Sequence, residues 1–248
     1  MLRRLATARL LWPGLFTLAA LAVLLALGKW QLDRKAWKEG IVAKIEKRVG
    51  APPVDLIPFV TATHEEPDLE YTHVRARGRY RHDLERYIYA PEQSGPGWHV
   101  LTPLMVGPET VIWINRGFVP EARKAPQTRA EGLVEGDVTV TGLLREPRSA
   151  TFTPANDVAR NVWYWADIPA LTASAFPDRK VQPLWVLVDV DAGDTPAGGL
   201  PRGGTTRLQI PNRHLEYALT WFGLAATLVG VFLAFAWGRL REGAPRAP

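Results

Sequence analysis

Two long uncharged segments, one near each end of the chain, constrain the fold more than any other feature. Residues 10–28 carry no charge and contain a single proline, Pro13, and residues 217–238 are uncharged throughout. At about 1.5 Å of rise per residue, helices of these lengths would measure roughly 28 and 33 Å, close to the thickness of the hydrocarbon core of a bilayer. We therefore expect one transmembrane helix near each end, at 10–28 and at 214–238.

Each segment has an alternative interpretation. The first is also compatible with a cleaved signal peptide, because Ala26-Leu27-Gly28 loosely resembles a small-residue cleavage site. Against this, the apolar run is long for a signal core and continues into a helical pattern. The second could be a buried core helix, but its length and its lack of charge favour a membrane span.

Basic residues flank both segments, and this pattern predicts the topology. They are Arg3, Arg4 and Arg9 at one end and Arg239, Arg241 and Arg246 at the other. We expect cytoplasmic tails at 1–9 and 239–248 and the intervening domain on the periplasmic side of a bacterial inner membrane. Lys29, Arg34, Lys35 and Lys38 weaken this prediction, because they crowd the outer end of the first segment. Since much of the net charge of +5 lies beside the apolar segments, we expect contact with membrane lipid and no nucleic-acid partner.

Residues 29–213 are predicted to form a single β-dominated α+β domain. Residues 29–49 prolong the first helix, and Gly50-Ala51-Pro52-Pro53 ends it. The period then changes to two, which indicates an antiparallel sheet or barrel. The predicted strands are 71–80, 86–90, 98–106, 110–115, 137–144, 162–166 and 184–190. One short helix is expected at 167–175, with Asp167 as its N-cap, and the Gly-rich stretch 191–204 is expected to be a loop.

No familiar catalytic motif is present, so we predict a protein that is not an enzyme. The chain has no cysteine, which excludes disulfides, thiolate nucleophiles and cysteine-based metal sites. No serine lies in a GxSxG elbow, and His73, His82 and His99 lack metal-ligand spacing. A membrane-tethered enzyme with a site assembled across strands stays open, motivated by these three histidines.

The start of the second apolar helix contains the most informative group of side chains. His214, Tyr217, Ala218, Trp221 and Ala225 share one helical face. Such a face suits a flat apolar macrocycle with an iron centre: the imidazole would be an axial ligand and the small residues would leave room for the ring. The neighbouring Arg213 could pair with propionates, and Asn212 is a plausible N-cap. The alternative is an interfacial histidine in a Trp/Tyr belt that binds no ligand.

Several motifs in order along the chain resemble one family. They are Leu27-Gly28-Lys29-Trp30-Gln31-Leu32-Asp33-Arg34, Gly78-Arg79-Tyr80 with Glu85, Gly97-Trp98-His99-Val100-Leu101-Thr102-Pro103-Leu104, Asn115-Arg116-Gly117-Phe118-Val119-Pro120, Asn161-Val162-Trp163-Tyr164, and Asn212-Arg213-His214-Leu215-Glu216-Tyr217 with Thr220-Trp221. Any one of these is weak, but their order between two membrane segments is specific. The chain resembles the Surfeit-locus (Shy) family of cytochrome c oxidase assembly factors.

The resemblance implies a non-catalytic role in bringing haem a to the core subunit of an aa3-type oxidase. It maps the family's haem-binding histidine onto His214, which would ligate the haem iron, with Trp221 as a second candidate two turns along the helix. Tyr217 and Arg213 complete the expected cofactor-binding set. The implied partners are the oxidase core subunit and haem a synthase. A scaffold that holds oxidase subunits together without touching haem is the alternative.

Overall fold

The computed structural model describes residues 10–63, 68–92, 95–149, 152–208 and 211–242. The predicted tail at 1–9, with Arg3, Arg4 and Arg9, and the end of the second tail, with Arg246, lie outside the described residues. The chain divides into two units, one made of residues 1–44 and 209–248 and the other of residues 45–208. The first contains one long helix and most of the other, and the second contains the sheet and residues 45–49 of that other helix.

The long helices are α2 (Leu11–Val49) and α5 (His214–Glu242). The strands are β1 (Val54–Asp55), β2 (His73–Tyr80), β3 (Arg86–Tyr89), β4 (Gly97–Met105), β5 (Thr110–Pro120), β6 (Asp137–Arg145) and β7 (Gln182–Val190). Two short helices, α3 (Leu56–Ala62) and α4 (Ile168–Ala175), accompany them. Short 3-10 segments occur at His82–Leu84, Glu121–Arg123, Pro126–Gly132 and Ala192–Asp194.

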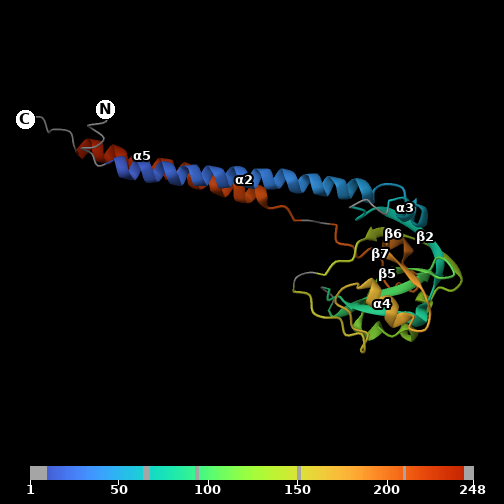
Figure 1. Cartoon of the computed structure of the whole chain (residues 1–248). Coiled ribbons are helices and arrows are strands. Elements are labelled where there is room, and N and C mark those ends of the chain that lie inside the picture. Colours follow the sequence, from blue (N-terminus) through green and yellow to red (C-terminus); the bar gives the residue numbers. More distant parts are fainter. Residues whose placement is uncertain (1–9, 64–67, 93–94, 150–151, 209–210, 243–248) are drawn as a thin grey trace, which may run out of the picture. The chain divides into compact units, whose positions relative to one another are not determined.

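In the helical unit α2 and α5 lie side by side (Figure 1) and run antiparallel, since Gly14 of α2 is next to Phe232 and Gly28 is next to Phe222. A Cβ atom at Gly28 would come within 2.6 Å of the Phe222 ring, so this glycine permits the close approach. Both helices are long and apolar enough to cross a membrane by length and composition. The expected apolar helix near each end is therefore confirmed, as is the continuation of the first through residues 29–49.

The sheet has the strand order β1-β2-β6-β7-β5-β4-β3, with a further pairing between β2 and β4. That pairing closes β2, β6, β7, β5 and β4 into a ring. The predicted α+β class is confirmed, but the sheet is mixed rather than wholly antiparallel, because β5–β7 and β1–β2 are parallel. Alternating hydrophobicity does not encode strand direction. The crossover through β6 and α4 brings β7 back beside β5 in the same direction.

Two apolar layers follow from the alternation along these strands. Inside the ring, side chains from β2, β4, β5, β6 and β7 pack with Leu56 and Val60 of α3. On the outer face, Trp113 of β5 and Leu187 of β7 pack against α4, and Figure 1 shows α4 lying over the sheet. The N-cap prediction for α4 is confirmed, since the Asp167 carboxylate accepts a hydrogen bond from Ala170 N at 3.1 Å.

The predicted strand at 162–166 is wrong. This segment makes only isolated bridges, at Val162 and Trp163. Trp163 is completely buried in the outer apolar layer under α4, and Asn161 before it adopts a positive φ of 53°. The apolar side chains that suggested a strand are thus explained by burial of an irregular segment.

Gly117 of β5 lies where the ring of strands contacts Arg202, in the segment that precedes α5. Its φ is +103°, and a Cβ atom there would overlap the carbonyl of Arg202, which accepts a hydrogen bond from Phe118 N at 2.9 Å. We predict that Gly117→Ala lowers the free energy of unfolding by at least about 1–3 kcal/mol, the usual cost of such backbone strain. Thermal unfolding of the full chain in detergent measures it. Gly193→Ala, with nothing near its Cβ position, is the control, and equal melting temperatures for the two variants would contradict the assignment.

Candidate functional site

His214 is the first residue of α5, and its ring is oriented by a residue of α2. Its Nδ1 lies 2.6 Å from Oε1 of Gln31, a side chain that is only 9% exposed. An amide oxygen can only accept a hydrogen bond, so Nδ1 carries the proton and donates. The lone pair of the ring is therefore on Nε2, for which the described residues offer no hydrogen-bond partner. This leaves one ring nitrogen fixed by a hydrogen bond and the other available as a ligand atom.

The other predicted site residues lie around this contact in different environments. Asn212 Oδ1 accepts a hydrogen bond from His214 N at 3.4 Å, which is consistent with a capping role. Arg213 pairs with Glu216 at 2.8 Å between Nη2 and Oε2, and both side chains are largely exposed. Tyr217 is 53% exposed and Trp221 is half-buried.

The small residues of the predicted face do not leave room for a macrocycle. Ala218 and Ala225 are 1% and 3% exposed in the unit where α2 and α5 pack together. That part of the prediction is wrong, because the small side chains serve close packing of the helices instead.

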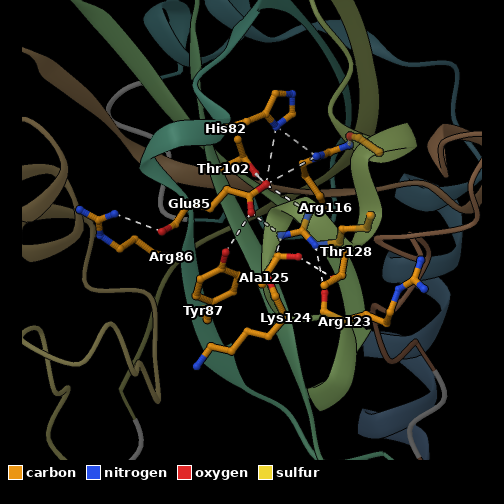
Figure 2. Close-up of polar contacts among 12 residues, drawn as sticks. His82, Glu85, Arg86, Tyr87, Thr102, Arg116, Arg123, Lys124, Ala125 and Thr128 are labelled. Carbon is orange, nitrogen blue, oxygen red and sulfur yellow. Dashed lines mark hydrogen bonds and ion pairs between the residues drawn. The ribbon is translucent and has the colours of Figure 1, made fainter.

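A second polar cluster surrounds Glu85 in the sheet unit, and Figure 2 shows His82, Tyr87, Thr102 and Arg116 directed toward its carboxylate. The Glu85 side chain is 1% exposed. Tyr87 and Thr102 donate hydrogen bonds to it at 3.1 and 3.4 Å. Arg129, also 1% exposed, donates to both of its oxygens.

The arginines of this cluster fix the 3-10 segments to the ring. The segment Pro126–Gly132 is broken at Arg129 (φ −141°, ψ 45°), whose side chain is buried. Besides binding Glu85, Arg129 donates to the carbonyls of Arg123 and Lys124. Arg116 of β5 donates to the Gly132 carbonyl at 2.6 Å. The cluster is thus a buried ion-pair network that attaches residues 121–132 to the sheet.

The same groups set the ionisation of Glu85. Burial alone would raise the pKa of this carboxyl, but His82, Arg129 and Arg116 outweigh it and hold the pKa below its ordinary value of 4.5. Glu85 is therefore a carboxylate at neutral pH whose oxygens accept several hydrogen bonds. Such a group is poorly suited to act as a general base.

The three histidines behind the enzyme hypothesis lie in separate local structures. His73 contacts the Ala51 carbonyl and the Asp191 carboxylate, at 2.9 and 2.7 Å. His82 Nε2 donates to the Val134 carbonyl at 2.9 Å. His82 Nδ1 lies 3.6 Å from Glu85, so a histidine–carboxylate pair does exist there. Within the described ranges, no group of three or more His, Asp or Glu side chains could hold a metal ion.

Two important residues were missed by the sequence analysis. Gln31 belongs to one of the motifs that carry the family resemblance, but the sequence alone assigns it no role. The available signal was its position: it is a polar residue just beyond the apolar run of α2, at the same end of the helix pair as His214. Arg129 gave no signal, because its partner Glu85 is far away in sequence and the kink that buries it is not encoded by any periodicity. Other family motifs support the fold: Asn161 Nδ2 donates to the Glu85 carbonyl and its Oδ1 accepts from Trp163 Nε1.

Comparison with known proteins decides the family. The model of the SURF1 family matches residues 18–226. The chain belongs to the SURF1 family. This confirms the resemblance seen in the sequence motifs, and the family is known for cytochrome c oxidase assembly factors.

Several proteins named as Surfeit locus protein 1 or SURF1-like are similar to the chain. Surfeit locus protein 1 of Xenopus tropicalis is 36% identical over 220 residues, which cover 81% of the chain and 68% of that relative. Surfeit locus protein 1 of Mus musculus is 36% identical over 228 residues, covering 85% and 71%. A SURF1-like protein of Monosiga brevicollis is 35% identical over 224 residues, covering 85% and 82%.

The buried ion pair of this SURF1-family chain makes a prediction about stability and pH. Glu85→Gln leaves Arg129 and Arg116 buried without a carboxylate, and we expect it to cost about 3–5 kcal/mol at pH 7. Because the pKa of Glu85 is lowered by folding, its contribution is present above the unfolded pKa near 4.5 and is lost as pH falls through the lower folded value. Denaturant unfolding of both proteins between pH 7 and 3 measures this.

The variant should therefore show a shallower loss of stability with acid than the wild type. Glu39→Gln, which removes an exposed carboxylate paired with Lys35, is the control and should change stability little. Parallel acid profiles for the wild type and Glu85→Gln would contradict the role given to Glu85.

Proposed function

We propose that this SURF1-family chain assists the binding of haem a to the core subunit of an aa3-type cytochrome c oxidase, with His214 as an axial ligand of the haem iron. The observation that carries the proposal is the hydrogen bond from His214 Nδ1 to Gln31 Oε1. Metal-ligating histidines almost always donate their other ring N–H to an acceptor, which fixes the tautomer and the ring orientation. His214 has this arrangement, with Nε2 left available.

The surrounding residues fit a bound haem in chemistry. Imidazole nitrogen is a common axial ligand of haem iron. Tyr217 and the half-buried Trp221 provide an aromatic surface beside His214, and the exposed guanidinium of Arg213 can turn from Glu216 to a propionate. When bound, the haem supplies an iron that accepts the imidazole nitrogen. The chain would hold and orient the imidazole through the Gln31 contact.

The proposed role is non-catalytic. It is supported by the family and by Glu85, whose carboxylate is held in an ion-pair network rather than poised as a base. The proposed partners are the oxidase core subunit, haem a synthase and membrane lipid.

The proposed location is a bacterial inner membrane, with α2 and α5 as the spans. Both termini would be cytoplasmic and residues 29–213 periplasmic. The two apolar helices support membrane insertion. The basic residues beside them in the sequence support the orientation.

The direct test is the absorption spectrum of the protein purified from cells that make haem a. We expect the wild type to carry a Soret band and His214→Ala to lose it, because the axial nitrogen is removed. His214→Met should keep haem with a shifted band, since a thioether can also ligate iron. His73→Gln, which alters a histidine of the sheet unit, should keep the wild-type band. An unchanged band in His214→Ala, or no haem in the wild type, would show that His214 is not the ligand.

Gln31 gives a second test that depends on the hydrogen bond itself. Gln31→Leu removes the acceptor for Nδ1, and we expect haem affinity to fall by about 10–100-fold, as is usual for loss of such an outer-shell partner. Gln31→Glu keeps an acceptor and should retain most of the affinity. Titration of the haem-free full chain with haem in detergent measures both. Equal affinities for Gln31→Leu and the wild type would show that the contact does not position His214 for ligation.

A further inference from the structure

The sheet unit contains a cavity of about 580 Å³ that is separate from the Glu85 network. Its volume lies within the range of small-molecule sites, about 300–1,000 Å³. Its floor comes from β4, β5 and β7, at His99, Asn115 and Asp189, and its rim includes Tyr89, Tyr164 and Arg207. Every one of these residues belongs to the same unit, residues 45–208.

The floor is a built polar network centred on Asp189, which is 6% exposed. Its carboxylate accepts hydrogen bonds from Asn115 Nδ2 at 2.8 Å, Arg145 Nη1 at 2.9 Å and Thr206 Oγ1 at 2.8 Å. Three donors occupy this buried acid, so it does not present a free negative charge to the cavity. The hydrogen-bonding capacity of Asp189 is therefore largely used within the floor itself.

His99 is the group of the floor that retains an unused hydrogen-bonding atom. Burial lowers the pKa of its ring, so the ring is neutral at pH 7. Asn115 Nδ2 donates to Nδ1 at 3.4 Å, which places the ring proton on Nε2. No acceptor for Nε2 is present among the residues that the structure describes, so this N–H is available as a donor.

The charges that line the cavity leave one arginine without a carboxylate. The three acids are each paired with an arginine: Asp189 with Arg145, which it shares with Glu70, Glu146 with Arg148, and Glu92 with Arg202. Arg207 is exposed, and the described part of the chain gives it neither an ion pair nor a hydrogen bond. An unpaired guanidinium on the rim and a neutral N–H donor on the floor together favour a ligand with anionic acceptor oxygens.

The walls favour a flat ligand. Tyr89 and Tyr164 meet edge to face with ring centroids 6.4 Å apart, and Trp165, Ile88 and Leu101 also line the cavity. Aromatic walls with a few convergent polar groups are typical of sites for small organic molecules.

We propose that this cavity binds a small planar organic anion, with its carboxylate on Arg207 and His99 and its flat body against Tyr89 and Tyr164. The site is a property of the sheet unit and does not depend on the haem proposal. Its ligand class is an aromatic monocarboxylate.

The test uses 2-naphthoate as the probe and 2-naphthamide as its uncharged counterpart, titrated into the full chain in detergent by calorimetry. The wild type should bind the carboxylate roughly tenfold or more tightly than the amide, because a hydrogen bond to a charged group is stronger than one to a neutral group. Arg207→Gln should lose this preference, and Arg160→Gln, an exposed arginine away from the cavity that pairs with Asp157, should keep it. All six titrations, two probes on each of three proteins, share the same detergent background.

A second measurement needs no substitution. Arg207 should be modified by phenylglyoxal in the free protein and protected by 2-naphthoate but not by 2-naphthamide, as read by peptide mass spectrometry. Three results would each overturn the proposal. They are equal binding of the carboxylate and the amide, equal effects of Arg207→Gln and Arg160→Gln on the preference, and a rate of Arg207 modification that 2-naphthoate does not change.

Discussion

The hydrogen bond between His214 and Gln31 is the interaction on which the functional interpretation of this structure depends. In the membrane location that we propose, helices gain nothing from burying apolar surface, so the association of α2 and α5 would rely on close packing and on polar contacts. α2 and α5 use both. Gly28 and the buried Ala218 and Ala225 permit the close approach, and the His214–Gln31 pair adds a polar contact at one end of it. The same contact determines which nitrogen of His214 is free.

The sheet unit is organised by a different kind of constraint. Its ring of five strands is closed by the short β2–β4 pairing, and irregular segments are attached to it by buried charges. Residues 121–132 are attached to the ring by the buried charges of Glu85, Arg116 and Arg129. Asp189 and Arg145 provide the matching network on the cavity side. Buried ion pairs of this kind add little net stability, but losing one partner is costly, which explains why motif residues such as Asn115 and Arg116 are structural here.

The sequence was sufficient to predict the long helices, most strands and α4, because each rests on a local signal: an uncharged run, a period of two or a capping aspartate. It was insufficient where a residue's environment comes from distant parts of the chain. The sequence predicts a strand at Trp163 because a large apolar side chain suits a buried strand and a buried irregular segment equally well. The sequence predicts room for a ligand at Ala218 and Ala225, but both side chains are buried in the helical unit. Gln31 and Arg129 acquire their roles only through partners on other elements, and the cavity at His99 is assembled from seven separate segments.

The haem content of the oxidase in cells that lack this chain tests the central claim most directly. The oxidase would be isolated through its core subunit and its haem a measured per core subunit, with subunit association followed in parallel. We predict that the core subunit is recovered with its partner subunits but is deficient in haem a, and that the wild-type chain restores the haem while His214→Ala does not. Full haem occupancy in whatever oxidase assembles, combined with loss of subunit association, would contradict a role in haem a binding and would identify the chain as a scaffold.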